Sequence, residues 1–355
     1  MNKKPGNTSV KEELRLMNGD ESHLPTVSAS PHIRSHDTTT GIMLDVIVAL
    51  IPSLIAAVAL FGPRAFAVTA ISVLSCMLFE YIARKAMKRQ NTLGDLSAVV
   101  TGILLAFNLP SAIPLWMVPV GAFIAIVIVK QFFGGIGQNF VNPALIGRII
   151  LMVSFPTAMS TWIGNYVWGG GADAVTSATP LASLATIFDG NDFSDASFAQ
   201  LPSNLQMLFG QTGGCLGETC AIAIILGMIY LIARRVISPI IPFVYVGTVA
   251  LIMLIAGCGS IRFMTAQLLS GGLLLGAVFM ATDYTTSPIN SKGKLIFAIG
   301  CGLFTSVIRL YGSFPEGVSF SIILMNILSP LIDLATKPKP FGYFKEKKEK
   351  KEADA

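Results

Sequence analysis

The stretch Leu44-Asp-Val-Ile-Val-Ala-Leu-Ile-Pro-Ser-Leu-Ile-Ala-Ala-Val-Ala-Leu-Phe61 contains one charged residue, Asp45. An apolar run of this length with so little charge is typical of a transmembrane helix. Similar blocks, such as Val118 to Val129, recur along the chain, which is 53% hydrophobic and 13% charged. Soluble proteins carry about 25% charged residues. The alternative, a soluble protein with an unusually large core, is therefore disfavoured, and we expect an all-α integral membrane protein.

Apolar runs bounded by turn residues predict about ten transmembrane helices. Five of them form a first membrane half over residues 41–156, at 41–62, 65–84, 95–109, 114–131 and 141–156. Five more form a second half over 216–335, at 216–233, 239–257, 263–282, 294–311 and 317–335. The third and fifth runs are short and interrupted by Gly and Pro, which suggests broken or re-entrant helices.

The distribution of positive charge predicts the orientation. With the N-terminal segment (1–40) in the cytoplasm, 21 of the 25 Lys and Arg residues fall in cytoplasmic segments, including Lys130 and the basic tail (336–355). Cytoplasmic loops of membrane proteins carry this excess. The loop 157–215 then lies on the outer face and contains no Lys or Arg. The same tail accounts for much of the net charge of +5, which we therefore do not interpret as nucleic-acid binding.

The two halves show a weak internal repeat. Thr101 to Pro110 parallels Gly271 to Met280, and Lys130 and Arg309 each close an apolar helix before a Gly-containing turn. An odd number of helices per half would place the halves in opposite orientations, an arrangement found in many transporters. The breaks at Leu109-Pro110 and at 282–288 would then face each other across a central site. Chance similarity between apolar helices is the alternative.

One polar block lies between the fourth and fifth runs, from Phe132 to Arg148. Asn139 and Asn142 offer amide groups, and Arg148 enters the membrane, where a charge is costly and marks a candidate functional site. We expect these three residues to contact a ligand, with a helix-packing turn as the alternative. A nucleotide-binding glycine loop is disfavoured because no strand precedes the glycines.

The outer loop contains Asp173-Ala-Val-Thr-Ser-Ala-Thr-Pro180. This segment resembles the signal at which flavin transferases attach FMN, through its phosphate, to the last threonine. The resemblance implies covalent FMN on Thr179, with Asp173, Thr176, Ser177 and Ala178 as the recognition residues. Ser177 stands where glycine is common in that signal. An ordinary Thr-Pro turn is the alternative.

Taken together, the motifs resemble one family, which contains the D subunit of the Rnf electron-transport complex and the B subunit of the sodium-pumping NADH:quinone reductase. The resemblance covers residues from about 25 to 335, and the length of the chain favours the Rnf branch. Its motifs are Ser30-Pro-His-Ile33, the Phe132–Arg148 block, the Asp173–Thr179 signal, Gly217-Glu-Thr219, Met280 to Pro288, Pro315-Glu-Gly-Val318 and Met325-Asn326.

The resemblance implies a membrane subunit that passes electrons between reduced ferredoxin and NAD in a complex that exports Na⁺ or H⁺ across the plasma membrane. It implies the A, B, C, E and G type subunits as partners, a flavin transferase during maturation, and a second flavin, riboflavin or FMN, held without a covalent bond. The chain shows no iron–sulfur cysteine motif and no dinucleotide fingerprint, so ferredoxin and NAD would bind to partners. A metal site is not expected, because no ligand-type spacing surrounds Cys215 and Cys220.

An ion path needs polar groups within the membrane. The candidate carboxylates are Asp45, Glu80, Glu218, Asp283 and Asp333, and Thr219, Thr282, Asn139 and Asn142 are candidate neutral ligands. Glu218 and Asp283 are favoured because they lie at the Gly-rich helix ends of the second half. Two alternative functions remain at this point: a quinone-reducing flavoprotein of the same family, and a solute channel or carrier without a flavin.

Overall fold

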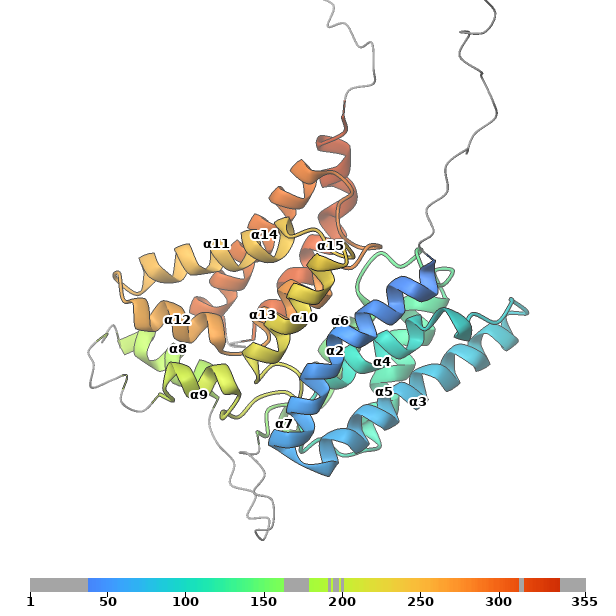
Figure 1. Cartoon of the computed structure of the whole chain (residues 1–355), viewed down its shortest axis with the longest axis horizontal. Helices are drawn as coiled ribbons and strands as arrows, with labels where there is room; N and C mark the ends of the chain where they lie inside the picture. The colour runs from blue at the N-terminus through green and yellow to red at the C-terminus, as the bar shows by residue number, and fades with distance from the viewer. Residues whose placement is uncertain are drawn as a thin grey trace, which may run out of the picture. The chain divides into compact units, whose positions relative to one another are not determined.

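The computed structural model describes residues 38–162, 179–190, 193, 198, 201–312 and 316–338. Every helix named below belongs to one compact unit that begins at Thr39. The described residues form helices and no strand (Figure 1). An isolated antiparallel bridge joins Pro110 and Cys215. The predicted all-helical class is confirmed for this part of the chain.

The first half contains a helix at each of its five predicted positions. They are α2 (Thr39–Phe61), α3 (Pro63–Ala86), α4 (Ser97–Phe107), α5 (Met117–Phe123) and α6 (Pro143–Ser154). A short 3₁₀ turn, η2 (Leu93–Asp95), precedes α4, and α7 (Pro156–Met159) follows α6. The helix that begins at α5 continues as a π-helix, η3 (Ile124–Gln131). Such π-helical segments are rare and are often found at functional sites.

The second half contains α10 (Ala221–Ala233), α11 (Ile240–Ala256), α12 (Ile261–Leu269), α13 (Leu273–Leu275) with the π-helical η5 (Gly276–Met280), α14 (Ser291–Tyr311) and α15 (Val318–Ala335). The prediction of one continuous helix over 263–282 is wrong. The chain bends by 63° between α12 and α13. Ser270 is extended there, and Gly271 adopts φ +66°, a left-handed conformation that favours glycine.

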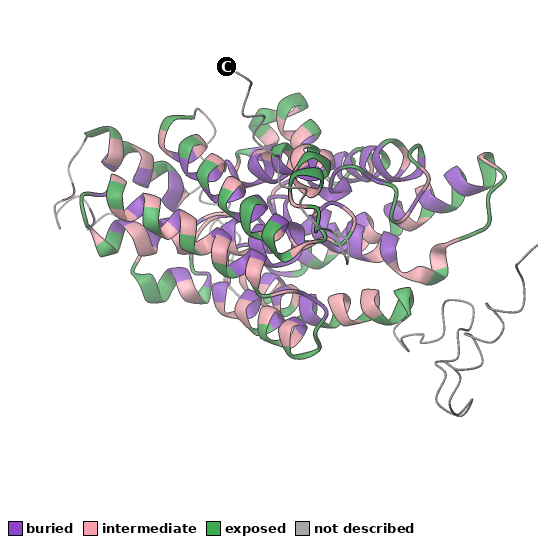
Figure 2. Ribbon diagram, turned by 90° about the horizontal axis from the view of Figure 1, so that it is seen from above, coloured by how far each residue is buried: buried purple, intermediate pink, exposed green. Residues whose placement is uncertain are grey.

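The length and exposure of these helices fit a membrane. In the described residues four helices, α2, α3, α14 and α15, are long and apolar enough to span a bilayer, and the bent pair α12–η5 can provide a fifth span. Five shorter apolar helices accompany them. Large apolar residues are exposed, for example Ile255 at 71% and Leu331 at 61%. Figure 2 shows that exposed residues recur along the outer helices. Water would penalise such surfaces, whereas lipid would not. The chain is a multi-pass membrane protein.

Helices also occur within the predicted outer loop, 157–215. Within 157–215 the structure contains α8 (Pro180–Gly190) and α9 (Asn204–Phe209). The signal for α9 is visible in the sequence, because Ser203 and Gln206 form a capping box at its N-terminus. α8 packs on α12 and α14, so the segment after Thr179 is held against the second half.

Gly102 allows α4 to pack closely on α3. A side chain at this position would meet the Val73 backbone, since a Cβ built on Gly102 lies 2.7 Å from Val73 Cα. We expect Gly102→Ala to lower the free energy of unfolding by about 1–3 kcal/mol, because neither backbone can retreat without repacking. Thermal unfolding of the detergent-solubilised protein would measure this effect. Gly94→Ala, with no atom within 4 Å of its added Cβ, is the matched control. Equal melting temperatures for the two variants would contradict the prediction.

Candidate functional site

Thr179 lies at the start of α8. The Ala182 N–H donates to the Thr179 carbonyl oxygen at 3.0 Å and lies 3.4 Å from its Oγ1. Pro180 is the first residue of the helix, where its missing N–H costs nothing. The Thr179 side chain is half-buried. The other residues of the expected transferase signal, Asp173, Thr176, Ser177 and Ala178, lie outside the described residues.

A small cavity of about 10 Å³ adjoins Thr179. Its wall includes Glu218 and Thr219, which precede α10, Gly271 at the bend between α12 and α13, and Glu316 before α15. Glu218 is 4% exposed, and its Oε1 accepts a 2.9 Å hydrogen bond from the Cys215 N–H. Among the described residues, its Oε2 and the Thr219 hydroxyl are buried without a hydrogen-bond partner. The fold thus brings the predicted attachment residue next to a predicted ion-path residue.

Arg148 belongs to this same region. The guanidinium, 3% exposed, forms an ion pair with Glu316 and donates to Asn108 Oδ1 and Ser319 Oγ, both at 2.9 Å. It also lies 3.7 Å from Cys215 Sγ. An unpaired charge at this depth would be strongly unfavourable. Arg148 therefore joins α6 of the first half to the start of α15 in the second.

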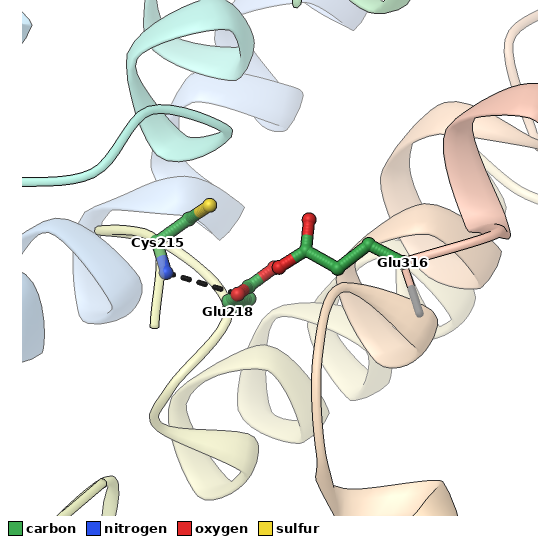
Figure 3. A group of neighbouring side chains, drawn as sticks. All are labelled: Cys215, Glu218 and Glu316. Carbon is green, nitrogen blue, oxygen red and sulfur yellow. Dashed lines mark hydrogen bonds between the residues drawn. The ribbon is translucent and has the colours of Figure 1, made fainter. Parts of the chain in front are cut away.

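Cys215, Glu218 and Glu316 resemble a set of metal ligands, because their ligand atoms lie within 4.8 Å of one another (Figure 3). One observation argues against a metal ion, because Arg148 already supplies a positive charge to Glu316. Burial raises the pKa of the Cys215 thiol, and the nearby Glu218 raises it further. We interpret this group as a charge cluster.

A second, much larger cavity of about 510 Å³ lies between the two halves. Residues of α2, α4 and η3 from the first half and of α10 and η5 from the second contribute to its wall, and these are mostly apolar. Asn139, Asn142 and Asp283 line it together, and Arg148 does not. The sequence suggests Asn139, Asn142 and Arg148 as one ligand-contacting group, but the structure separates them. Arg148 lies near Glu218, whereas the two asparagines line the large cavity together with Asp283.

The polar side chains of this cavity are held in place by the chain itself. Asn142 caps α6 by accepting from the Ala144 N–H at 3.1 Å, and its amide donates to the Met280 carbonyl at 3.4 Å. Asn139 donates to Thr285 Oγ1 at 3.0 Å. Asp283 accepts from Thr285 and Thr286. Burial raises the pKa of the Asp283 carboxyl above its usual value, and these hydrogen bonds only partly oppose the shift. The arrangement is preorganised, as binding sites usually are.

Buried polar contacts connect the two cavities. Asn108, which follows α4, accepts from Arg148 and places its Nδ2 3.7 Å from the Met280 sulfur, and Met280 in turn accepts from Asn142. The expected meeting of Leu109-Pro110 with residues 282–288 is not found among the described contacts. Instead Leu216 N–H donates to the Leu109 carbonyl at 3.1 Å, beside the Pro110–Cys215 bridge. The chain after α4 therefore pairs with the segment before α10.

The remaining acidic candidates have structural partners. Asp45 accepts from Tyr230 at 2.8 Å and pairs with the exposed Arg234 at 3.3 Å. Asp333 accepts from the Ile289 N–H at 3.1 Å. Glu80 pairs with Lys130 at 2.8 Å in a fully buried position. Lys130, which the charge distribution assigns to a cytoplasmic segment, is buried in the protein at the end of η3.

Comparisons with known proteins show which family the chain resembles. The model of the NQR2, RnfD, RnfE family matches residues 26–342. The chain is 47% identical to the D subunit of the Na⁺-translocating ferredoxin:NAD⁺ oxidoreductase complex of Acetobacterium woodii, over 92% of this chain and 98% of the relative. It is 42% identical to the D subunit of the proton-translocating complex of Clostridium ljungdahlii, over 89% and 96%. It is 32% identical to the D subunit of the ion-translocating oxidoreductase complex of Escherichia coli, over 90% and 99%.

Proposed function

Because the chain belongs to the NQR2, RnfD, RnfE family, we propose that it is the D subunit of an ion-translocating ferredoxin:NAD⁺ oxidoreductase complex. The observation that carries this proposal is the similarity to subunits of that name over nearly the whole of both chains. The other Rnf subunits are its partners and supply the ferredoxin and NAD sites. The complex lies in the plasma membrane, with this chain spanning it ten times as two inverted halves and with both termini in the cytoplasm.

We propose that Thr179 carries FMN through a phosphoester bond on the outer face, attached by a flavin transferase that reads Asp173, Thr176, Ser177 and Ala178. The position of Thr179 supports this. A phosphate on its Oγ1 would lie at the N-terminus of the 11-residue helix α8, where the helix dipole favours negative charge. The half-buried side chain is accessible to a modifying enzyme. Bound there, FMN would supply a one- or two-electron carrier.

We further propose that the 510 Å³ cavity holds the second flavin without a covalent bond. Its volume and mostly apolar wall suit a flat heteroaromatic ring, and the fixed Asn139 and Asn142 side chains offer polar contacts for the ring edge. Among the described residues that line it, Lys130 is the only cation, and Asp283 carries the opposite charge, so the wall offers little to a phosphate. Riboflavin therefore fits this cavity better than FMN.

The ion path is proposed to include Glu218 and Asp283. Glu218 has a buried carboxylate oxygen without a partner among the described residues, and Asp283 lies in the cavity wall between the halves. Oxygen ligands of this kind suit hard cations such as Na⁺.

We expect Glu218→Ala and Asp283→Ala each to reduce ion uptake per electron severalfold, with flavin still attached to Thr179. Ion accumulation in proteoliposomes, during ferredoxin-dependent NAD⁺ reduction, measures this ratio. Asp189→Ala, an exposed carboxylate at the end of α8, is the control. Normal ion uptake per electron in both variants would contradict this proposal.

The function itself is tested by genetic replacement. A strain lacking this gene should lose NAD⁺ reduction by reduced ferredoxin in its membranes, and the affinity-tagged chain should restore that activity and co-purify with the other subunits. Reduction of a quinone by NADH, instead of NAD⁺ by ferredoxin, would favour the quinone-reductase alternative. Restoration of solute transport without any redox activity would favour a channel or carrier.

A further inference from the structure

A buried lysine lies in the wall of the large cavity with its counter-charge behind it. Lys130 is 3% exposed and lines the cavity, whereas its partner Glu80 is fully buried and does not line it. The Lys130 Nζ lies 2.8 Å from Glu80 Oε2. The positive end of this ion pair is therefore the end nearer to a molecule in the cavity.

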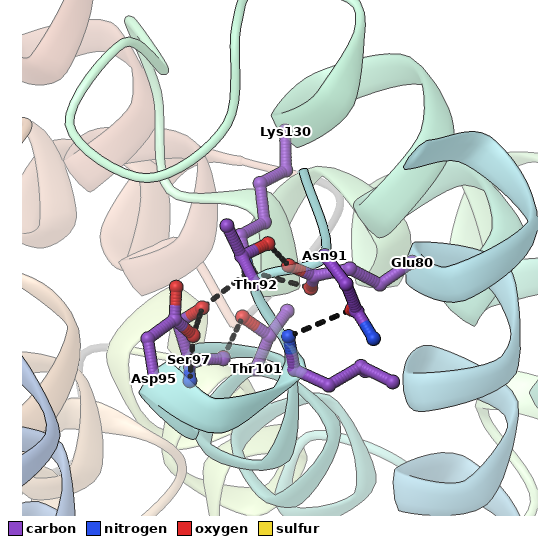
Figure 4. Close-up of polar contacts among 8 residues, drawn as sticks. Glu80, Asn91, Thr92, Asp95, Ser97, Thr101 and Lys130 are labelled. Atoms are coloured by element: carbon purple, nitrogen blue, oxygen red, sulfur yellow. Dashed lines mark hydrogen bonds and ion pairs between the residues drawn. The ribbon is translucent and has the colours of Figure 1, made fainter. Parts of the chain in front are cut away.

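Hydrogen bonds hold the pair in this orientation (Figure 4). The Thr92 hydroxyl donates to Glu80 Oε1 at 2.7 Å, so both oxygens of the carboxylate are satisfied. Lys130 also donates to Ser97 Oγ at 2.6 Å, and Ser97 donates to Asp95 Oδ1 at 2.5 Å. A buried ammonium that keeps two partners cannot swing away from the wall without losing them.

The carboxylates around the cavity are each held by hydrogen bonds to neutral groups. Asp283 is the second charged side chain among the described lining residues, and its oxygens accept from Thr285 and Thr286 of its own loop. Asp95 is half-buried and lies beyond Ser97. Because the remaining wall is largely apolar, the local dielectric is low and a single charge acts strongly.

We propose that Lys130 stabilises the negative charge that the non-covalent flavin acquires on reduction, and so sets the reduction potential of that flavin. This inference rests on the proposed second flavin. An electron delivered from reduced ferredoxin through the complex, without an accompanying proton, adds one negative charge to the ring, and the fixed ammonium compensates it. Preorganised charge of this kind costs no rearrangement when the electron arrives. The π-helical turn of η3 places the lysine at this wall.

The test is a redox titration of the purified complex in which this chain carries Thr179→Ala, so that its covalent flavin is absent. Lys130→Met/Glu80→Gln removes both charges and leaves no buried ion unpaired. We expect the ratio of reduced to oxidised flavin at a given potential to fall at least tenfold, about 59 mV for a one-electron couple. Glu80→Gln alone leaves Lys130 without its counter-charge, so the potential should rise. Lys85→Met, an exposed cation that does not line the cavity, should change nothing.

Opposite shifts in the two variants would support the role of Lys130, because a purely structural defect would move both in one direction or release flavin from both. Flavin that is released by denaturation and counted per chain separates binding from potential. Unchanged potentials with full flavin content, or shifts of the same sign, would overturn this inference and leave the flavin site standing. Absence of releasable flavin from the parent complex would overturn the flavin site and the role of Lys130 together.

Discussion

Thr179→Ala is expected to abolish flavin fluorescence from the denatured polypeptide. A phosphoester bond needs the threonine oxygen, and no other hydroxyl stands at the last position of the Asp173–Thr179 signal. The protein should fold normally, because the Thr179 hydroxyl makes a single long contact with the described residues, at 3.4 Å from the Ala182 nitrogen. A denaturing gel viewed under ultraviolet light, together with the intact mass of the chain co-expressed with a flavin transferase, measures the loss.

The control for this experiment lies on the same helix. Thr186 is exposed on α8, and its hydroxyl donates to the Ser183 carbonyl at 2.8 Å. Thr186→Ala should keep the full flavin mass. Asp173→Asn should reduce attachment, because it changes the first residue of the recognition signal. A Thr179→Ala chain that still carries the mass of FMN would place the flavin elsewhere and remove the main argument for an electron carrier on the outer face.

Arg148→Met is expected to be among the most destabilising single substitutions in the membrane part of the chain. It removes the positive charge that Glu316 pairs with and the donors to Asn108 and Ser319. Breaking a buried ion pair from one side costs about 3–5 kcal/mol, because the remaining charge is left uncompensated. We expect a large fall in the melting temperature of the detergent-solubilised protein and little assembled complex in membranes.

A second substitution separates lost charge balance from lost packing. In Arg148→Met/Glu316→Gln both members of the ion pair are neutral, so part of the stability should return. This non-additivity is what a double-mutant cycle measures for groups in direct contact. Arg89→Met, at an exposed position after α3, should have little effect. If Arg148→Met melts at the same temperature as Arg89→Met, the cluster does not depend on this charge.

The membrane class and the position of every long helix could be predicted from the sequence, because apolar runs and turn residues are local signals. Features that depend on tertiary contacts could not. Lys130 follows an apolar run and reads as the end of a span, but η3 and the approach of Glu80 bury it. The bend at Gly271 resembles any other Gly pair in a helix. The separation of Arg148 from Asn139 and Asn142 follows from α6, which begins after the Asn142 cap and places Arg148 further along the helix.

The candidate site was predictable to the same extent. Thr179, Glu218 and Asp283 are candidates from their residue types and positions, and their roles stay predictions. Their neighbours could not, since Glu316, Asn108 and Met280 reach the two cavities from distant parts of the chain. A short motif identifies its own residues, whereas a cavity between two halves depends on how those halves pack, for which a single sequence carries no direct signal.

The docking of α8 has a mechanical consequence for any group attached at its start. Phe188 of α8 stacks near Phe263 of α12, with ring centroids 6.5 Å apart, and lies edge-on to Tyr311 of α14 at 5.9 Å. A prosthetic group tethered to Thr179 would thus be attached to a helix that packs on α12 and α14. The polarisation of its fluorescence would then report changes in the orientation of α8 and of the helices it packs on.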